Sequence, residues 1–103
     1  MICLFCKKEM VLNPATLVSG CSKCKIYYST FRDYYYGYVD ENGFQPRLEV
    51  KNLLTVTIYI NFNKLKIMDH GRGCSVIEFN IENFTLECVN KLIKKIFKMK
   101  KYI

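Results

Sequence analysis

The chain begins Met1-Ile2-Cys3-Leu4-Phe5-Cys6, and the same cysteine spacing returns as Cys21-Ser22-Lys23-Cys24. Two thiolates separated by two residues can lie on one tight turn with both sulfur atoms facing a common point. Two such turns supply the four corners of a tetrahedron, the arrangement that Zn²⁺ accepts most readily. The spacing therefore predicts one metal site with the ligands Cys3, Cys6, Cys21 and Cys24.

Zinc is favoured at this site, in a structural role. Four protein thiolates leave no coordination position open for water or substrate, so a catalytic metal is not expected. The same ligands hold iron in rubredoxins, which would make the protein an electron carrier. Rubredoxin-type turns usually have glycine after the second cysteine, whereas this chain has Lys7 and Lys25 there. A redox-active dithiol would need a helix starting at the motif, and neither flank has a helical pattern.

The residues around the cysteines favour short strands, so we expect residues 1–29 to form a metal-bound ribbon. The doubled motif with strand-forming flanks resembles the zinc-ribbon group. That resemblance implies a fold and no single function, because ribbons serve transcription, translation, replication and scaffolding alike. The expected strands are Met1–Leu4, Met10–Leu12, Thr16–Val18 and Ile26–Ser29.

An antiparallel sheet is expected over residues 30–80. Apolar and polar residues alternate from Leu54 to Phe62, which is typical of a half-buried strand. A turn near Asn61–Lys64 leads into a returning strand, and Cys74–Phe79 reads as a further one, so three consecutive strands form a meander. Together with an aromatic strand in the thirties, we expect four to five strands continuous with the ribbon.

The last element is predicted to be an amphipathic helix over residues 84–101. Thr85 is the expected N-cap, with Glu87 in the first turn. Apolar residues recur at helical spacing and would pack on the sheet. The opposite side would present Lys91, Lys94, Lys95, Lys98 and Lys101. The predicted fold class is α+β, in a single domain of 103 residues.

Two surfaces are candidates for contact with a partner. In the aromatic run Ile26–Val39, either Tyr34, Tyr36 and Tyr38 or else Tyr35 must face outwards, because side chains alternate along a strand. Exposed tyrosine beside basic residues is a common contact surface for proteins. Tyrosine rings can also stack on unpaired bases, and the lysine face of the helix could contact phosphates.

The formal net charge is +7, and the excess lies at the C-terminus, where residues 85–103 hold six lysines against the single Glu87. This is a moderate bias, which admits a nucleic acid partner without requiring one. No window has the length of a membrane span, and nothing at the N-terminus has the pattern of a signal peptide. We therefore expect a cytoplasmic protein that does not bind membranes.

An enzyme is not expected. His70, the only histidine, lies between Asp69 and two glycines in a predicted turn, and with Cys74 it would lack two ligands for a second metal site. No nucleophile and base pair or phosphate-binding glycine loop can be assembled, so no small-molecule substrate is expected. The expected function is a zinc-stabilised binding module that docks on a macromolecule, most simply a protein, with nucleic acid binding and electron transfer as alternatives.

The order of elements also carries a resemblance. A ribbon, an aromatic strand, a Thr-x-Ile-x-Ile strand, the string Ile77-Glu78-Phe79 and a helix capped by Asn83-Phe84-Thr85 are similar to small uncharacterised proteins of tailed phages. This resemblance implies a viral accessory protein in the host cytoplasm that acts on host machinery or belongs to a complex.

Overall fold

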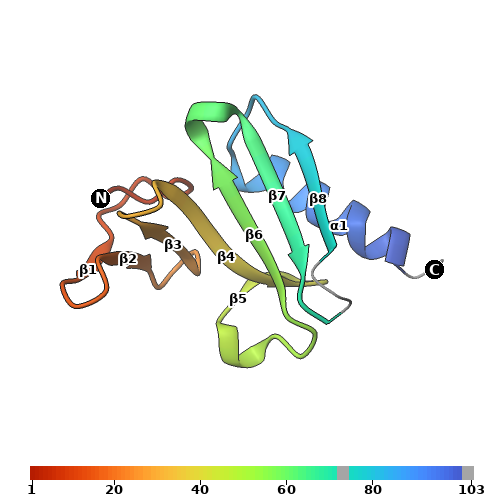
Figure 1. Ribbon diagram of the computed structural model, residues 1–103, viewed down its shortest axis with the longest axis horizontal. Helices are drawn as coiled ribbons and strands as arrows, with labels where there is room; N and C mark the ends of the chain where they lie inside the picture. The colour runs from red at the N-terminus through yellow and green to blue at the C-terminus, as the bar shows by residue number, and fades with distance from the viewer. Residues whose placement is uncertain (72–74, 101–103) are drawn as a thin grey trace.

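The computed structural model describes residues 1–71 and 75–100, which form one eight-stranded antiparallel sheet and one α-helix (Figure 1). The order across the sheet is β1-β2-β3-β4-β6-β7-β8, and β5 pairs with β4. The α+β class predicted from the sequence is confirmed. The strands are β1 (Val11–Asn13), β2 (Val18–Cys21), β3 (Ile26–Ser29), β4 (Tyr34–Asp40), β5 (Gly43–Gln45), β6 (Leu54–Tyr59), β7 (Lys64–Asp69) and β8 (Ser75–Asn80).

The first strands of the expected ribbon differ partly from the prediction. Ile26–Ser29 is β3 with the predicted bounds. The segment Met1–Leu4 is not a strand and forms only an isolated bridge from Ile2 to Glu9. The stretches predicted at Met10–Leu12 and Thr16–Val18 are displaced towards β1 and β2, because the turn between them occupies residues 14–17.

Four turns in the first third of the chain share one geometry. In each, the backbone N–H of the fifth residue donates to the carbonyl of the first, over 2.8 to 3.1 Å, and the fifth residue has a positive φ between 53 and 63°. Both cysteine pairs therefore sit on the same type of turn that connects β1 to β2 and β3 to β4. The four turns are Cys3–Lys7, Asn13–Leu17, Cys21–Lys25 and Ser29–Asp33.

Strand β4 lies in the middle of the strand order and pairs along both of its edges. Its first half pairs with β3 and its second half with β5, while β6 pairs along the other edge. The turn into β5 has Gly43 at φ 105°. Gly37 lies under the ring of Phe44, where an added Cβ would be 2.6 Å from two ring atoms. A glycine inside a strand often marks such a close approach.

The predicted meander is formed by β6, β7 and β8, which pair in sequence. Strand β6 ends at Tyr59 and not at Phe62, because the chain enters a 3-10 turn over Ile60–Phe62. Asn63 then adopts the left-handed conformation that closes the hairpin. Asparagine tolerates this conformation better than most residues, since its short side chain clashes little with the backbone.

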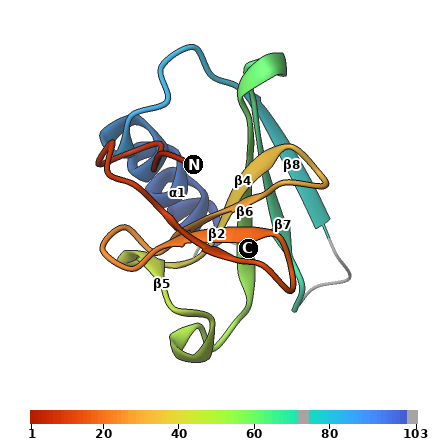
Figure 2. The ribbon, with the colours of Figure 1, turned by 90° about the vertical axis from the view of Figure 1, so that its left-hand side faces the viewer.

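Helix α1 (Leu86–Lys100) covers one face of the sheet, and the N-terminal segment lies on the same side (Figure 2). The backbone N–H of Cys88 donates to Thr85 Oγ1 over 3.2 Å, so the predicted N-cap is confirmed. Within the described part of the chain, no helix is long and apolar enough to cross a membrane. The buried core beneath the helix consists mainly of Leu54, Val56, Ile58, Leu65, Ile67, Val89, Ile93 and Ile96.

Candidate metal centre and tyrosine face

The four cysteines predicted as ligands come together at one end of the sheet. Their sulfur atoms all lie within 4.8 Å of one another, and Cys6 Sγ is 3.7 Å from Cys21 Sγ. A tetrahedral zinc with Zn–S bonds of about 2.3 Å separates its sulfur ligands by about 3.8 Å. No disulfide joins these cysteines. Spacing and donor type therefore fit one metal ion with thiolate ligands.

The turn geometry explains how each pair points both sulfur atoms inwards. The N–H of Lys7 donates to the Cys3 carbonyl over 3.1 Å, and the N–H of Lys25 donates to the Cys21 carbonyl over 2.9 Å. Both lysines adopt the left-handed conformation, with φ near 63 and 58°. Glycine would adopt this conformation at no cost, but lysine does so here as well. The missing glycines therefore do not distinguish zinc from iron, although the sequence suggested that they would.

Without a metal, the thiols would not ionise together. A backbone hydrogen bond from Lys8 lowers the pKa of the Cys6 thiol to about 7. Burial raises the pKa of the Cys24 thiol to about 12 and also raises that of Cys3. A metal that binds all four as thiolates must displace these protons, so its affinity should fall as the pH is lowered.

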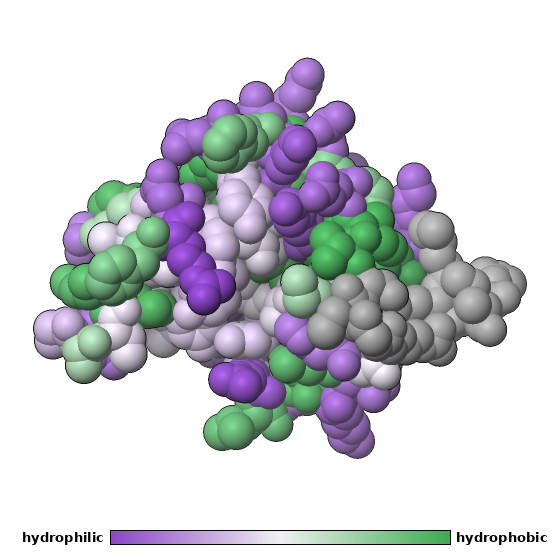
Figure 3. Space-filling view, in the orientation of Figure 1, coloured by the Kyte–Doolittle hydropathy of each residue, from purple (hydrophilic) through white to green (hydrophobic). Residues whose placement is uncertain are grey.

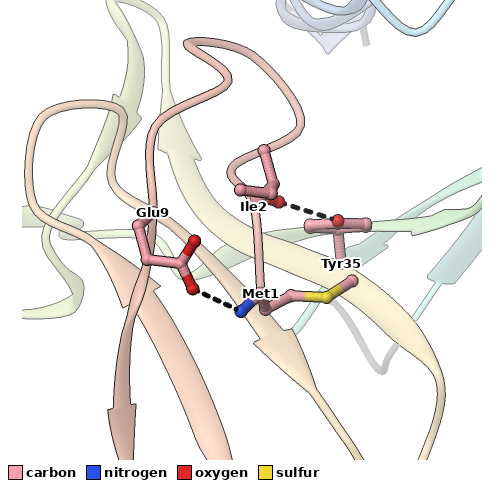
Figure 4. Close-up of polar contacts among 4 residues, drawn as sticks. All are labelled: Met1, Ile2, Glu9 and Tyr35. Atoms are coloured by element: carbon pink, nitrogen blue, oxygen red, sulfur yellow. Dashed lines mark hydrogen bonds and ion pairs between the residues drawn. The ribbon is translucent and has the colours of Figure 1, made fainter.

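The cysteine turns are tied to β4 by contacts on the core side of the sheet. Tyr35 Oη donates to the carbonyl of Ile2 over 3.0 Å, and the amino group of Met1 pairs with Glu9 Oε1 over 3.0 Å (Figure 4). The ring of Phe5, which lies between Cys3 and Cys6, is 5.4 Å from the ring of Phe44. The cysteine turns are therefore linked through Tyr35 to β4 and through Phe44 to β5.

Tyr34, Tyr36 and Tyr38 share the face of β4 opposite the helix, whereas Tyr35 is buried on the core side. Neighbouring rings along this row are 5.9 and 6.3 Å apart. Tyr27 from β3 stacks on Tyr36 at 5.5 Å, and Tyr59 from β6 meets Tyr34 edge-on at 5.3 Å. We call these five residues, Tyr27, Tyr34, Tyr36, Tyr38 and Tyr59, the tyrosine face.

A groove of about 470 Å³ runs along this face. Tyr34, Tyr36 and Tyr38 line it, with Arg32, Arg47 and His70. Figure 3 shows this side of the molecule, with near-neutral side chains over the middle strands and both hydrophilic and hydrophobic ones around them. The groove combines aromatic rings with basic groups.

Three cations lie against individual rings of the tyrosine face. Arg32 Nη1 donates to Tyr34 Oη over 3.1 Å. The Arg47 guanidinium carbon is 5.8 Å from the centre of the Tyr38 ring. Lys66 Nζ is 5.2 Å from the centre of the Tyr59 ring. These distances are typical of cation–π contacts for Arg47 and Lys66.

The lysines predicted as a second contact surface lie elsewhere. Lys91, Lys94, Lys95 and Lys98 are exposed on α1, which covers the opposite face of the sheet. Lys101 lies outside the described residues. The two candidate surfaces are therefore on opposite sides of the molecule and cannot form one continuous site.

Sequence reasoning missed Tyr27, Tyr59 and the two arginines. Tyr59 could have been found, because it falls on the polar side of the alternation in β6, as Thr55 and Thr57 do. Arg32 and Arg47 belong to connections on either side of β4, and only the pairing of the strands brings them to one groove.

His70 is exposed, and its Nε2 lies 3.2 Å from Thr55 Oγ1. Cys74 lies outside the described residues, so a site shared with His70 is not tested. Comparison of the chain with protein-family models, with curated proteins and with solved structures finds no match in any of the three. Support for the zinc-ribbon resemblance therefore comes from the cysteine cluster, and the resemblance to phage proteins gains none.

Proposed function

We propose that this protein is a non-catalytic, zinc-stabilised binding module that docks a macromolecular partner on its tyrosine face. The observation that carries the proposal is the gathering of five tyrosines from three strands on the sheet face that neither α1 nor the cysteine turns cover. Large amphipathic rings bring contact area at little cost in conformational entropy, which is why they are enriched at binding surfaces.

Zinc has a supporting part in this proposal. A site in which all four ligands are protein thiolates has no open position for water or substrate, so its contribution is to stability. Structural zinc sites supply roughly 10–16 kcal/mol of apparent binding free energy, which is comparable to the whole stability of a small domain. Through Tyr35 and Phe5, that stabilisation reaches β4 and the tyrosine face.

The sequence favoured a protein as the partner, and a viral role acting on host machinery remains a prediction from the resemblance to phage proteins. The lysine face of α1 is a weaker candidate surface. Lys91 lies 4.0 Å from Glu87, and Lys94, Lys95 and Lys98 are exposed to solvent. Solvated lysine faces are routine on amphipathic helices.

Affinity enrichment with matched variants tests the proposal. Immobilised wild-type protein, a face variant with Tyr36→Leu and Tyr38→Leu, and a helix variant with Lys94→Ala and Lys98→Ala are exposed to the same bacterial extract. We expect at least one protein or nucleic acid to be retained by the wild type and the helix variant and lost from the face variant. Equal retention by all three, with folding of each verified, would rule out the tyrosine face as the working surface.

A further inference from the structure

We propose that the tyrosine face binds single-stranded nucleic acid, with bases stacked on the rings and phosphates held by Arg32, Arg47 and Lys66. This inference rests on the proposed function, since it names the class of partner that the same face takes. Its support is the chemistry of the groove and its edges.

The charge of the groove is unbalanced. Two arginines and a histidine line it, and no carboxylate does so among the described residues. Neither Arg32 nor Arg47 forms an ion pair with a carboxylate in the part of the chain that the structure describes. A partner that is complementary to this groove is therefore anionic, and a nucleic acid backbone provides one negative charge per nucleotide.

The rings are placed to receive flat groups. Tyr34, Tyr36 and Tyr38 recur at every second residue of β4, and their planes are nearly perpendicular from one to the next, at 82 and 88°. Tyr27 stacks on one face of Tyr36 and Arg47 lies over the Tyr38 ring. Tyr34, Tyr36 and Tyr38 nevertheless all line the groove, so each presents the rest of its ring surface there. Every base has a π face, so stacking on such rings tolerates any sequence.

The cations lie at the borders of the ring cluster, where a backbone would pass. Arg32 is at the Tyr34 end of the row and Arg47 at the Tyr38 end, while Lys66 lies beside Tyr59 on the neighbouring strands. Arg32 uses one of its five N–H donors on Tyr34, which leaves donors for a phosphate. Lys66 is also 3.2 Å from Glu78, so its contribution should be smaller than that of the arginines.

A single strand fits this face better than a duplex. Bases in a duplex are paired and stacked, so their faces are not available to a sheet surface. The helix α1, an element of the size that a major groove admits, lies on the other side of the sheet. The same face could take an acidic protein segment, which the experiment treats as a separate outcome.

Tyrosine fluorescence gives a direct readout, because the chain has eight tyrosines and no tryptophan. Zinc-loaded protein is titrated with an oligodeoxythymidine of about a dozen nucleotides, a length within the range that single-strand binding folds cover. The same strand is also followed by fluorescence anisotropy. We expect saturable quenching together with a rise in anisotropy, and much weaker binding of a blunt duplex of the same length.

Two charge variants with matched charge changes assign the phosphate contacts. Three contacts predict that the logarithm of the binding constant falls with the logarithm of salt with a slope of about −2. Changing both Arg32→Ala and Arg47→Ala should reduce this slope to about −0.7 and weaken binding at low salt. The control, Lys94→Ala with Lys98→Ala on α1, removes the same charge and should leave the slope unchanged.

Two substitutions at one tyrosine separate the loss of base stacking from a loss of folding. Tyr36→Phe keeps the π face and should bind within about twofold of the wild type, whereas Tyr36→Leu should weaken binding by tenfold or more, as loss of a stacked base does. Thermal unfolding and zinc content of both variants must match the wild type. If Tyr36→Leu fails to fold, the same comparison is made with Phe and Leu at Tyr38, because the Tyr34 hydroxyl accepts a hydrogen bond from Arg32 and its loss would disturb a phosphate contact.

The outcomes distinguish this inference from the proposed function. No binding of the single strand, or binding that is insensitive to the arginine and tyrosine variants, overturns the inference. If the extract then still yields a partner lost from the face variant, or if poly-glutamate binds in place of the oligonucleotide, the binding module stands with a protein partner. Binding that is lost only in the α1 lysine variant contradicts both.

Discussion

Replacing Gly37 by alanine should destabilise the protein by about 1–3 kcal/mol, the usual cost of an overpacked core. An added Cβ would lie 2.6 Å from Cδ1 and Cε1 of Phe44 and 3.3 Å from the carbonyl oxygen of Lys25. Alanine suits the extended backbone of β4, so the cost arises from the contact alone. The Phe44 ring also packs against Phe5, 5.4 Å away between the ring centres, and Phe5 lies between two of the cysteines in the sequence, so movement of the ring would disturb this contact.

A double-mutant cycle with Phe44→Ala separates this contact from any other effect. With the ring removed, Gly37→Ala should be neutral or stabilising by about 0.5 kcal/mol, because alanine restricts the unfolded chain more than glycine does. The coupling energy between the two positions should therefore be about 2 kcal/mol, which is within the range seen for residues in contact. The matched control is Gly20→Ala, where the nearest contact is a looser 3.2 Å to Tyr27.

Urea unfolding of the five zinc-loaded proteins, the four of the cycle and the Gly20→Ala control, is followed by circular dichroism and measures these differences. The free energy of unfolding must fall with urea concentration at the same slope in each protein, so that the unfolding midpoints can be compared. A Gly37→Ala protein as stable as the wild type would refute the tight packing of Phe44 on β4. An equal cost in the presence and absence of the Phe44 ring would show that the alanine acts elsewhere.

Three further perturbations follow from the same structure. Removal of the metal with a chelator should unfold residues 1–29, seen as collapse of their amide chemical shifts, and unchanged shifts would speak against a structural metal. Thr85→Ala should cost about 1 kcal/mol of stability by removing the cap on α1, while Thr85→Ser should cost far less. Tyr28 Oη donates to Asp33, which raises the pKa of Tyr28 to about 12. Because the folded state holds this proton more tightly than the unfolded state, the stabilisation is present below pH 10 and is lost between pH 10 and 12. The free energy of unfolding, measured against pH in this range, should show this loss in the wild type and not in Tyr28→Phe.

The elements that could be predicted from the sequence are those whose local residue pattern matches the burial that they have in the fold. The alternation of β6 reflects one buried face, and Thr85 both caps α1 and precedes its apolar stripe. The cysteine spacing predicted which four sulfur atoms would meet. In these cases a short stretch of chain is enough for the prediction, because its apolar period or its cysteine spacing is compatible with one local geometry.

The side on which the tyrosines lie could not be predicted, since a shift of one residue exchanges the two faces of a strand. The structure resolves the choice through Gly37 and Val39, which lie on the core side with Tyr35. Glycine at that position leaves room for the Phe44 ring, and Phe44 arrives from β5 through a hairpin. Arg32 and Arg47 likewise reach the groove only through pairing that a local pattern does not encode.

Native mass spectrometry of the intact protein, purified without added metal, tests most directly the claim that zinc stabilises this binding module. The prediction is a mass excess of one zinc ion per chain, bound through Cys3, Cys6, Cys21 and Cys24 and lost when the sample is acidified. A folded protein with no bound metal, or one that carries iron at the same ligands, would contradict it.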